Sequence, residues 1–292
     1  MYVNNLISGV IYYIASTLND AKMLLVENLS EENLKDVFKI CSWDRAFAHN
    51  DDPVLERGRE IKRRWLLDML EQHGPCAKIA YLDGRPVAQI VFYPEEAIPY
   101  IADPRKDVVH LQCIYSPFPD AQRRGVGTAL MKDLLDECRS GLSFLWGRPC
   151  SFLVTKPSPH EGDLPLDDFY EKYGFRQGSQ EMFLEIGGKY VDRGTPEYRP
   201  LPEDHGRIIV LYNPACEWGA FLAYKVEEIG KEVDLPVETF NIWEKPEAFM
   251  KRPIDRVTSG RVIVNTKLLE GGLFWSDQNA FRRVLKETLD TT

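Results

Sequence analysis

One stretch of the sequence constrains the fold more than any other, the run from residue 108 to residue 139. It opens with an apolar, strand-like segment over residues 108–115 and continues through a turn-rich loop over residues 116–121. Residues 122–129, Q-R-R-G-V-G-T-A, then lead into a helix with apolar residues at three- and four-residue spacing: Leu130, Met131, Leu134, Leu135 and Cys138. The pattern predicts a strand, a glycine loop and an amphipathic helix in direct succession.

The glycine loop predicts an anion site at the start of this helix. The first N–H groups of a helix lack intrahelical partners and lie at the positive end of its dipole. Gly125 and Gly127 carry no Cβ, so an anion can come close, and Arg123 and Arg124 add positive charge. The loop lacks the Gly-Lys-Ser/Thr ending of a P-loop and the third glycine of the dinucleotide fingerprint. A chance pair of glycines at an ordinary strand–helix turn is the alternative.

The surrounding segments predict an α/β domain. Strands are expected over residues 23–26, 76–82, 86–93, 150–155 and 180–186, and helices over about 30–41, 53–73 and 167–173. Residues 28–32 supply a cap and an acidic first turn for the first helix, and Asp83-Gly84 is a hairpin turn. The apolar stretch from Leu6 to Ala15 predicts an extra helix or strand packed on the domain.

Two motifs carry a resemblance to a known family. Q-x-x-G-x-G at residues 122–127 resembles the acetyl-CoA signature of the GNAT acyltransferase superfamily, and F-Y-E-K-Y-G-F at residues 169–175 resembles the F-Y-x-K-x-G-F that follows its fifth strand. The predicted element order, β-α-α-β-β-β-α-β-α-β over roughly residues 20–190, also resembles that superfamily. The resemblance implies an acyl-CoA N-acyltransferase fold, a mixed and mostly antiparallel sheet with helices on both faces. It gives a first domain over residues 1–190, with residues 1–20 as an extension.

The resemblance also implies a binding site for acetyl-CoA, with no metal. The glycine-loop amides would hold the pyrophosphate, and the end of the motif strand would pair with the pantetheine arm. The implied contact residues are Cys113, Ile114, Tyr115, Gln122, Arg123, Arg124, Gly125, Val126, Gly127 and Thr128. Residues 116–121 form a loop about two residues longer than is usual in the family, so the register of the strand contacts stays open.

The sequence points to one catalytic acid more clearly than to a catalytic base. Tyr170 stands at the family position whose phenol protonates the departing sulfur; the alternatives are a half-buried helix tyrosine at that position, or Tyr173 as the acid. His110 is the candidate base, because alternation places it with Gln112 on one strand face and Val109, Leu111 and Cys113 on the other. The alternatives are a satisfied core or surface histidine, a water chain, or Glu95 and Glu96 facing the acceptor. For these two glutamates the sequence favours a solvated loop.

A second domain is predicted after a polar, proline-rich linker over residues 191–206. Residues 207–292 show the order β-α-β-α-β-β-α, which resembles the thioredoxin fold of YoaP-like domains. Cys216 stands at the strand–helix junction, where a helix N-terminus would lower its pKa, but Gly219 occupies the place of a second redox cysteine. This disfavours a dithiol oxidoreductase and leaves a monothiol role or a domain kept for packing. Trp218 is expected at an interface or in the core.

Composition narrows the class of function. The 292-residue chain has a formal charge of −9, which argues against a nucleic-acid binder and suits a cationic amine acceptor. Its six cysteines form no C-x-x-C pair, which favours a reducing, cytoplasmic compartment, and no signal peptide or membrane span is predicted. We expect an N-acetyltransferase that moves acetyl from acetyl-CoA to a primary amine by direct attack in a ternary complex. The alternatives are a non-catalytic acyl-CoA sensor and a monothiol redox protein led by Cys216; a homodimer is left open.

Overall fold

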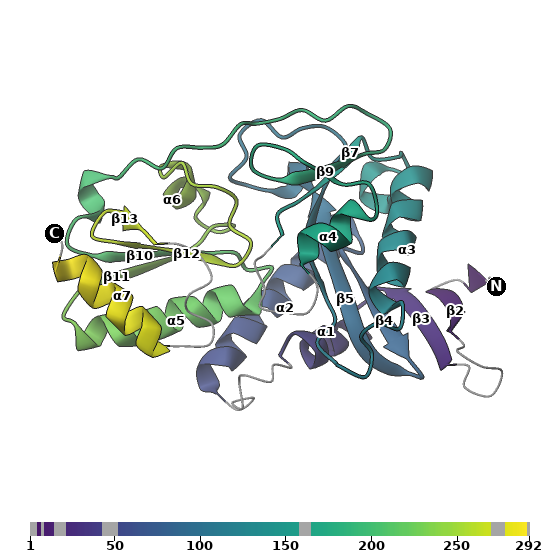
Figure 1. Ribbon diagram of the computed structural model, residues 1–292, viewed down its shortest axis with the longest axis horizontal. Coiled ribbons are helices and arrows are strands. Elements are labelled where there is room, and N and C mark those ends of the chain that lie inside the picture. Colours follow the sequence, from purple (N-terminus) through teal and green to yellow (C-terminus); the bar gives the residue numbers. More distant parts are fainter. Residues whose placement is uncertain are drawn as a thin grey trace.

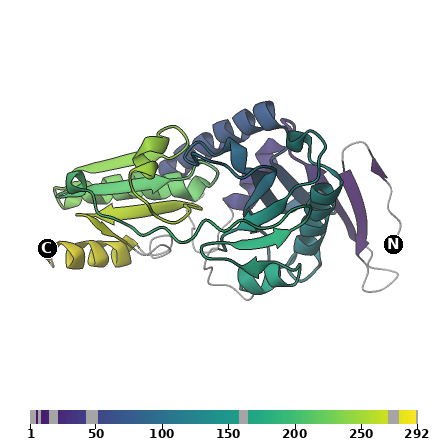
Figure 2. The ribbon, with the colours of Figure 1, turned by 90° about the horizontal axis from the view of Figure 1, so that it is seen from above.

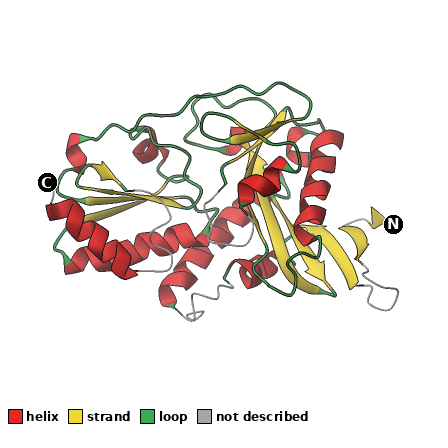
Figure 3. Cartoon of the chain, viewed as in Figure 1, coloured by secondary structure: helices red, strands yellow, loops and turns green. Residues whose placement is uncertain are grey.

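The computed structural model describes residues 5–6, 9–14, 22–42, 52–157, 165–269 and 278–290. They form two α/β units, each built on one sheet (Figure 1). Helices flank both sheets (Figure 3). None of the described helices combines the length and the apolar composition that a membrane crossing needs.

The front unit has a nine-stranded sheet in the order β1-β2-β3-β4-β5-β6-β7-β9-β8. Its strands are β1 (Asn5–Leu6), β2 (Gly9–Ile14), β3 (Lys22–Asn28), β4 (Ala77–Leu82), β5 (Arg85–Pro94), β6 (Val108–Tyr115), β7 (Phe152–Thr155), β8 (Arg176–Gln177) and β9 (Met182–Glu185). Its helices are α1 (Leu34–Cys41), α2 (Pro53–His73), α3 (Val126–Ser140) and α4 (Leu166–Glu171), with short 3-10 turns η1 (Glu95–Ala97) and η2 (Ser143–Leu145). The predicted element order is confirmed, and the early apolar stretch adds β2, a strand antiparallel to β3.

The predicted start of the first helix is wrong by several residues. Helix α1 begins at Leu34, because Asn33 ties the preceding residues into a turn. Its side-chain oxygen accepts a hydrogen bond from the N–H of Ser30 at 2.8 Å, and its amide donates to the carbonyl of Asn28 at 3.0 Å. The second helix starts as expected, since Asp52 caps α2 by accepting from the N–H of Val54 at 2.8 Å.

The two faces of the front sheet have different neighbours. On one face, α3 and α4 bury a core that includes Val109, Leu111 and Ile114. The other face is covered by α1, α2 and the rear unit, and its core joins residues from both units, such as Trp65 and Ile263. Helix α2 lies between the two sheets in both views (Figures 1 and 2). The rear unit therefore forms part of the covering of the front sheet.

The rear unit follows the short turn η3 (Pro202–Asp204) and has a four-stranded sheet in the order β11-β10-β12-β13. Its elements are β10 (Ile208–Tyr212), α5 (Glu217–Glu232), β11 (Val237–Asn241), α6 (Pro246–Met250), β12 (Gly260–Val264), β13 (Lys267–Leu268) and α7 (Gln278–Asp290). Strand β10 pairs parallel with β11 and antiparallel with β12. The order predicted from the sequence is confirmed; the turn expected over residues 270–272 and the helix start expected at Ser276 lie outside the described residues.

Helices α2 and α5 join the two units at a close crossing. An added Cβ at Gly58 would lie 2.5 Å from the carbonyl oxygen of Glu217. Lys225 on α5 forms an ion pair with Asp52 at 3.0 Å, and Trp218 donates its Nε1–H to the carbonyl of Cys41 at 3.2 Å. The expectation that Trp218 lies at an interface is confirmed. The crossing distance depends on glycine at position 58, because any side chain there would push the helices apart.

We predict that Gly58→Ala lowers the free energy of unfolding by about 1–3 kcal/mol, as overpacking usually does. In an ordinary helix the same change would be stabilising, by up to about 1 kcal/mol. Denaturant unfolding of both proteins measures the difference. Glu60→Ala, on the exposed side of the same helix, is the control and should stay within about 0.5 kcal/mol of the parent. A Gly58→Ala protein as stable as the parent would contradict the close crossing.

Candidate active site

The glycine loop forms an open anion cradle at the start of α3. Gly125 is the N-cap residue and adopts a left-handed conformation, φ +74°, with nothing within 4 Å of where a Cβ would be. The first backbone bond of the helix runs from the N–H of Ala129 to the carbonyl of Gly125, at 2.9 Å. Among the described residues, no backbone carbonyl accepts from the N–H groups of residues 124–128. Residues 122–125 are exposed, so these amides are available to an anion.

The two sequence motifs meet at this cradle. A Cβ at Gly127 would lie 3.6 Å from the ring of Phe169 on α4 and 3.9 Å from the side chain of Ile114 on β6. Gln122 donates from its amide to the carbonyl of Ser116 at 3.2 Å, which closes the loop on itself. The cradle, α4 and the end of β6 therefore form one continuous surface.

Strands β6 and β7 part directly beside the cradle. They pair in parallel from Val108↔Phe152 to Leu111↔Thr155, and β7 ends there. Strand β6 continues to Tyr115, paired with β5 alone. Within the described ranges, the backbone edge of residues 112–114 that faces away from β5 therefore has no strand beside it, which suits pairing with an extended ligand.

A bulge at Gln112 corrects the predicted alternation of β6. Opposite β5, the pairing passes from Phe92↔Leu111 to Val91↔Cys113, so Gln112 is an extra residue. Leu111 and Ile114 pack towards α3, whereas Cys113 and Tyr115 pack towards α2 and the rear unit. Simple alternation predicts that Cys113 shares a face with Leu111. The bulge places the two residues on opposite faces instead. Of the predicted strand residues, only Ile114 points to the cradle side.

Tyr170 lies at the parting of the strands. Tyr170 is buried, 1% exposed, and its phenol lies near the hydroxyl of Thr155, the last residue of β7. Burial raises the pKa of Tyr170 well above its usual value, so the phenol stays protonated at neutral pH. Tyr173 is only half-buried and packs against Phe169, with ring centroids 5.1 Å apart. Tyr170 is thus the tyrosine that can donate a proton at this point.

His110 is part of a buried ionic network. Its Nε2 lies 2.7 Å from Oε2 of Glu95, which also pairs with Arg105 and Arg193. Burial opposes ionisation of Glu95, but hydrogen bonds from His110 and Arg105 outweigh it and hold the pKa of this carboxyl well below its usual range. The expectation of a solvated loop is therefore wrong for Glu95, which is fully buried, and right for the exposed Glu96.

The ring of His110 is neutral at physiological pH. Burial and then the charge of Arg256 lower the pKa of His110, and Glu95 only partly compensates. The neutral ring donates from Nε2 to Glu95, which leaves Nδ1 as its acceptor. That atom is buried and has no hydrogen-bond partner among the described residues.

A loop of the rear unit docks where the strands part. Gln112 accepts a hydrogen bond from the hydroxyl of Tyr93 at 2.7 Å and donates one to the carbonyl of Thr258. Lys156, directly after β7, forms an ion pair with Asp255. Arg256 lies between these two attachments, with Nη2 3.5 Å from the carbonyl of Leu111. No sequence motif marks residues 255–258, so only the packing of the two units reveals their place at the site.

The cysteine of the rear unit is not activated. Cys216 is the N-cap residue of α5, but burial raises its pKa, and neither the charge of Lys62 nor backbone hydrogen bonds compensate. The predicted lowering of this pKa is therefore wrong, because desolvation outweighs the helix terminus. At Gly219, where a second cysteine would stand, an added Cβ would lie 2.3 Å from the carbonyl of Ser259. The packing of α5 itself excludes a dithiol pair.

Lys62 is a buried cation that the sequence analysis did not single out. It lies on α2 next to the predicted apolar stripe, is 1% exposed, and its Nζ lies 2.9 Å from Sγ of Cys41. A lysine three residues before Trp65 could have been noticed as interrupting the buried face.

Among the described residues, no three His, Cys, Asp or Glu side chains lie close enough together to hold a metal ion.

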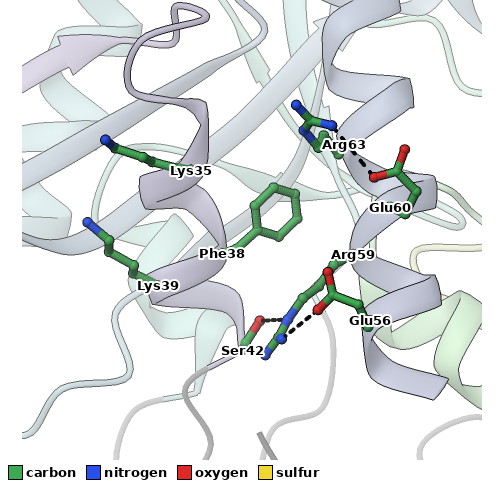
Figure 4. A pocket seen from close by; sticks show the side chains of 8 residues that line it. All are labelled: Lys35, Phe38, Lys39, Ser42, Glu56, Arg59, Glu60 and Arg63. Atoms are coloured by element: carbon green, nitrogen blue, oxygen red, sulfur yellow. Dashed lines mark hydrogen bonds and ion pairs between the residues drawn. The ribbon is translucent and has the colours of Figure 1, made fainter. Parts of the chain in front are cut away.

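A separate pocket of about 490 Å³ lies between α1 and α2 (Figure 4). Its lining residues are Lys35, Phe38, Lys39, Ser42, Glu56, Arg59, Glu60 and Arg63. Arg59 pairs with Glu56 at 3.0 Å and Arg63 with Glu60 at 3.7 Å, so much of its charge is neutralised internally. None of the site residues predicted from the sequence lines it.

The buried histidine makes stability depend on pH. In the unfolded chain His110 has a pKa of about 6.5, and in the folded chain the pKa is lower. Below about pH 6.5 the unfolded state therefore binds more protons, and stability falls as pH falls. We predict that His110→Gln removes this contribution, of up to about 1.4 kcal/mol per pH unit. Denaturant unfolding at pH 7.5 and 5.0 measures it.

His205→Gln, at an exposed histidine, is the control for this measurement and should keep the parent's pH dependence. Equal pH dependence in His110→Gln and the parent would show that folding does not lower the pKa of His110.

Comparison with protein families places residues 35–175 in the acetyltransferase (GNAT) family. A GNAT family acetyltransferase from Brucella melitensis, solved with acetyl-CoA, is 19% identical; the match covers 58% of this chain and 92% of that one, with a TM-score of 0.38. The ribosomal-protein-S18-alanine N-acetyltransferase of Escherichia coli is 17% identical, with 59% and 98% covered and a TM-score of 0.38. The PaiA N-acetyltransferase of Thermoplasma acidophilum, solved with coenzyme A, is 15% identical, with 56% and 99% covered and a TM-score of 0.39. No curated protein matches the sequence.

Proposed function

Since residues 35–175 form an acetyltransferase domain of the GNAT family, we propose that the protein transfers acetyl from acetyl-CoA to a primary amine by direct attack in a ternary complex. One observation carries the proposal. The open amide cradle at residues 124–128, the unpaired edge of β6 and the phenol of Tyr170 adjoin one another on the α3 side of the sheet. A phosphate group, an extended arm and a departing sulfur each find a matching partner there.

The residues would act in sequence along this surface. The cradle amides hold the pyrophosphate, and the edge of residues 112–114 aligns the thioester next to the bound amine. The amine nitrogen attacks the acetyl carbon, a C–N bond forms, and the C–S bond breaks. Tyr170 donates its proton to the departing thiolate. Because the pKa of Tyr170 is raised, this acid is available throughout the neutral pH range.

Water is the more suitable acceptor for the amine's proton. The pKa of His110 is lowered by burial and by Arg256, so Nδ1 is a weak base at neutral pH. We therefore assign His110 to the buried network around Glu95 and the proton transfer to solvent. A water chain was one of the alternatives to His110 that the sequence left open.

The rear unit supports the catalytic unit without redox chemistry of its own. We propose a thioredoxin-like fold for it, supported by the strand order β11-β10-β12-β13 with one parallel and two antiparallel pairs. The raised pKa of Cys216 and the close contact at Gly219 disfavour a thiol reaction there. All six cysteines are free thiols, which is consistent with a reducing compartment such as the cytoplasm.

The cradle can be tested without harming the fold. Gly127 has no positive φ, and an added Cβ would make ordinary contacts, so Gly127→Asp should fold and even favour the helix N-terminus. Its charge would repel the pyrophosphate, and we predict at least a hundredfold loss of acetyl-CoA affinity by calorimetry. Ser140→Asp adds the same charge at the other end of α3 and should bind normally. Unchanged affinity in Gly127→Asp would remove the cradle from the proposal.

The acid role predicts a defect in the chemical step alone. Tyr170→Phe keeps the buried ring but loses the donor, so we expect kcat to fall roughly ten- to a hundredfold, the low end of general acid effects. Acetyl-CoA affinity should hardly change, because the donation matters as charge develops on sulfur. Tyr173→Phe is the matched control and should retain kcat. If only the control loses activity, the acid has been assigned to the wrong tyrosine.

A further inference from the structure

We propose that Arg256, a residue of the rear unit, binds the carboxylate of the acceptor, so that the acceptor is a small amino acid. This inference rests on the proposed amine acetylation and names its substrate class. Arg256 lies in the loop between α6 and β12, which docks against the point where β6 and β7 part. The cation therefore reaches the transfer point from the second unit of the chain.

The position of the guanidinium follows from two contacts. Nη2 lies 3.5 Å from the carbonyl of Leu111, the last β6 residue paired with β7, and 3.4 Å from Oε1 of Gln112 at the bulge. Its charge lowers the pKa of His110 and also acts on Tyr170. Arg256 is thus near both residues that the sequence marks as catalytic candidates, although it comes from 86 residues beyond Tyr170.

Arg256 has no carboxylate partner among the described residues, unlike Arg252 and Arg105. Arg252 pairs with Asp204 through two nitrogens, and Arg105 pairs with Glu95 and Glu181. Asp255, the acidic neighbour of Arg256, is already engaged by Lys156 and by Arg261. A covered cation without a counter-ion is costly, and proteins seldom keep one unless a ligand supplies the charge.

Two donors of the guanidinium are free. Nε and Nη1 of Arg256 are buried and have no hydrogen-bond partner within the described ranges, and the same is true of the hydroxyl of Tyr100. The charge of Arg256 acts on the pKa of Tyr100, so these groups are neighbours. Nε and Nη1 each lie beside Nη2, on different edges of the guanidinium, so a carboxylate on either edge would meet one of these donors together with Nη2. Unpaired donors of this kind match a carboxylate better than any neutral group.

The alternative is that Arg256 only fastens the rear unit to β6. Its two contacts are long for hydrogen bonds, and Oε1 of Gln112 already accepts from Tyr93 at 2.7 Å. The fastening is done by Gln112 with Thr258 and by Lys156 with Asp255. Nε and Nη1 are buried, so binding of a carboxylate through them requires the loop to move away from β6.

The arrangement also suits the chemistry of transfer. A carboxylate held by Arg256 places an α-amine two bonds away, beside the open edge of β6 where the thioester is expected. A fixed positive charge near the amine disfavours its ammonium form and so favours the neutral nucleophile. This reduces the need for a strong protein base, in agreement with the low pKa of His110.

The test compares amines that differ only in a carboxylate. Leucine and 3-methylbutylamine, phenylalanine and phenethylamine, and methionine and 3-(methylthio)propylamine are assayed as acceptors by release of free CoA, with products identified by mass. We expect the full-length protein to prefer the amino acid in at least one pair. Arg256→Met should lower kcat/KM for that amino acid about ten- to a hundredfold, as expected for a lost charge-assisted hydrogen bond. It should change the value for the matching amine less than threefold.

Two further variants separate binding from docking. Lys156→Met breaks the ion pair that holds the same loop but leaves Arg256 in place, so any loss should be equal for both members of a pair. Arg256→Lys keeps the positive charge but loses the planar guanidinium, so its loss of kcat/KM should be smaller and still specific to amino acids. If a thermal melt shows that Arg256→Met is unfolded, Arg256→Lys takes its place in the comparison.

The outcomes are distinct. Acetylation of amines with no preference for the carboxylate form overturns the role of Arg256 and leaves the proposed function intact. An equal loss for both members of a pair in Arg256→Met makes the residue a fastener and also overturns it. Failure to acetylate any amine overturns the proposed function, and this inference with it.

Discussion

The bulge at Gln112 is the feature on which the site depends. One extra residue in β6 turns Ile114 towards α3 and Cys113 towards α2, so the strand serves a different neighbour on each face. The same residue accepts from Tyr93 and donates to the carbonyl of Thr258. Without the extra residue, the strand would continue its alternation and the rear loop would lose its attachment next to the parting of the strands.

Burial and charge are arranged differently on the two sides of this strand. Around His110, the carboxylates of Glu95 and Glu181 balance Arg105, and Arg193 lies against Glu95, so the charges stabilise one another. Between the units, Arg256 touches only neutral oxygens among the described residues. Networks of the first kind fix a structure, whereas an unbalanced buried cation is a common sign of a functional site.

The rear unit packs as a covering element of the front sheet. Helix α5 lies so close to the loop before β12 that only glycine fits at position 219, and so close to α2 that only glycine fits at position 58. These contacts, which draw the two units together, also remove the space that a second cysteine would need. The lack of room for a second cysteine at position 219 and the attachment to the front unit thus have one geometric cause.

The sequence by itself determined the elements and their order in both units, because periodic apolar residues, capping Asp52 and the Asp83-Gly84 turn act locally. It also located the cradle and Tyr170, since both belong to short motifs whose geometry is set by neighbouring residues. It could not foresee the bulge at Gln112, the buried state of Glu95 or the raised pKa of Cys216. Only the tertiary structure decided these, and the position of Arg256 beside Leu111, because they depend on contacts between residues far apart in the chain, with desolvation set by what packs around them.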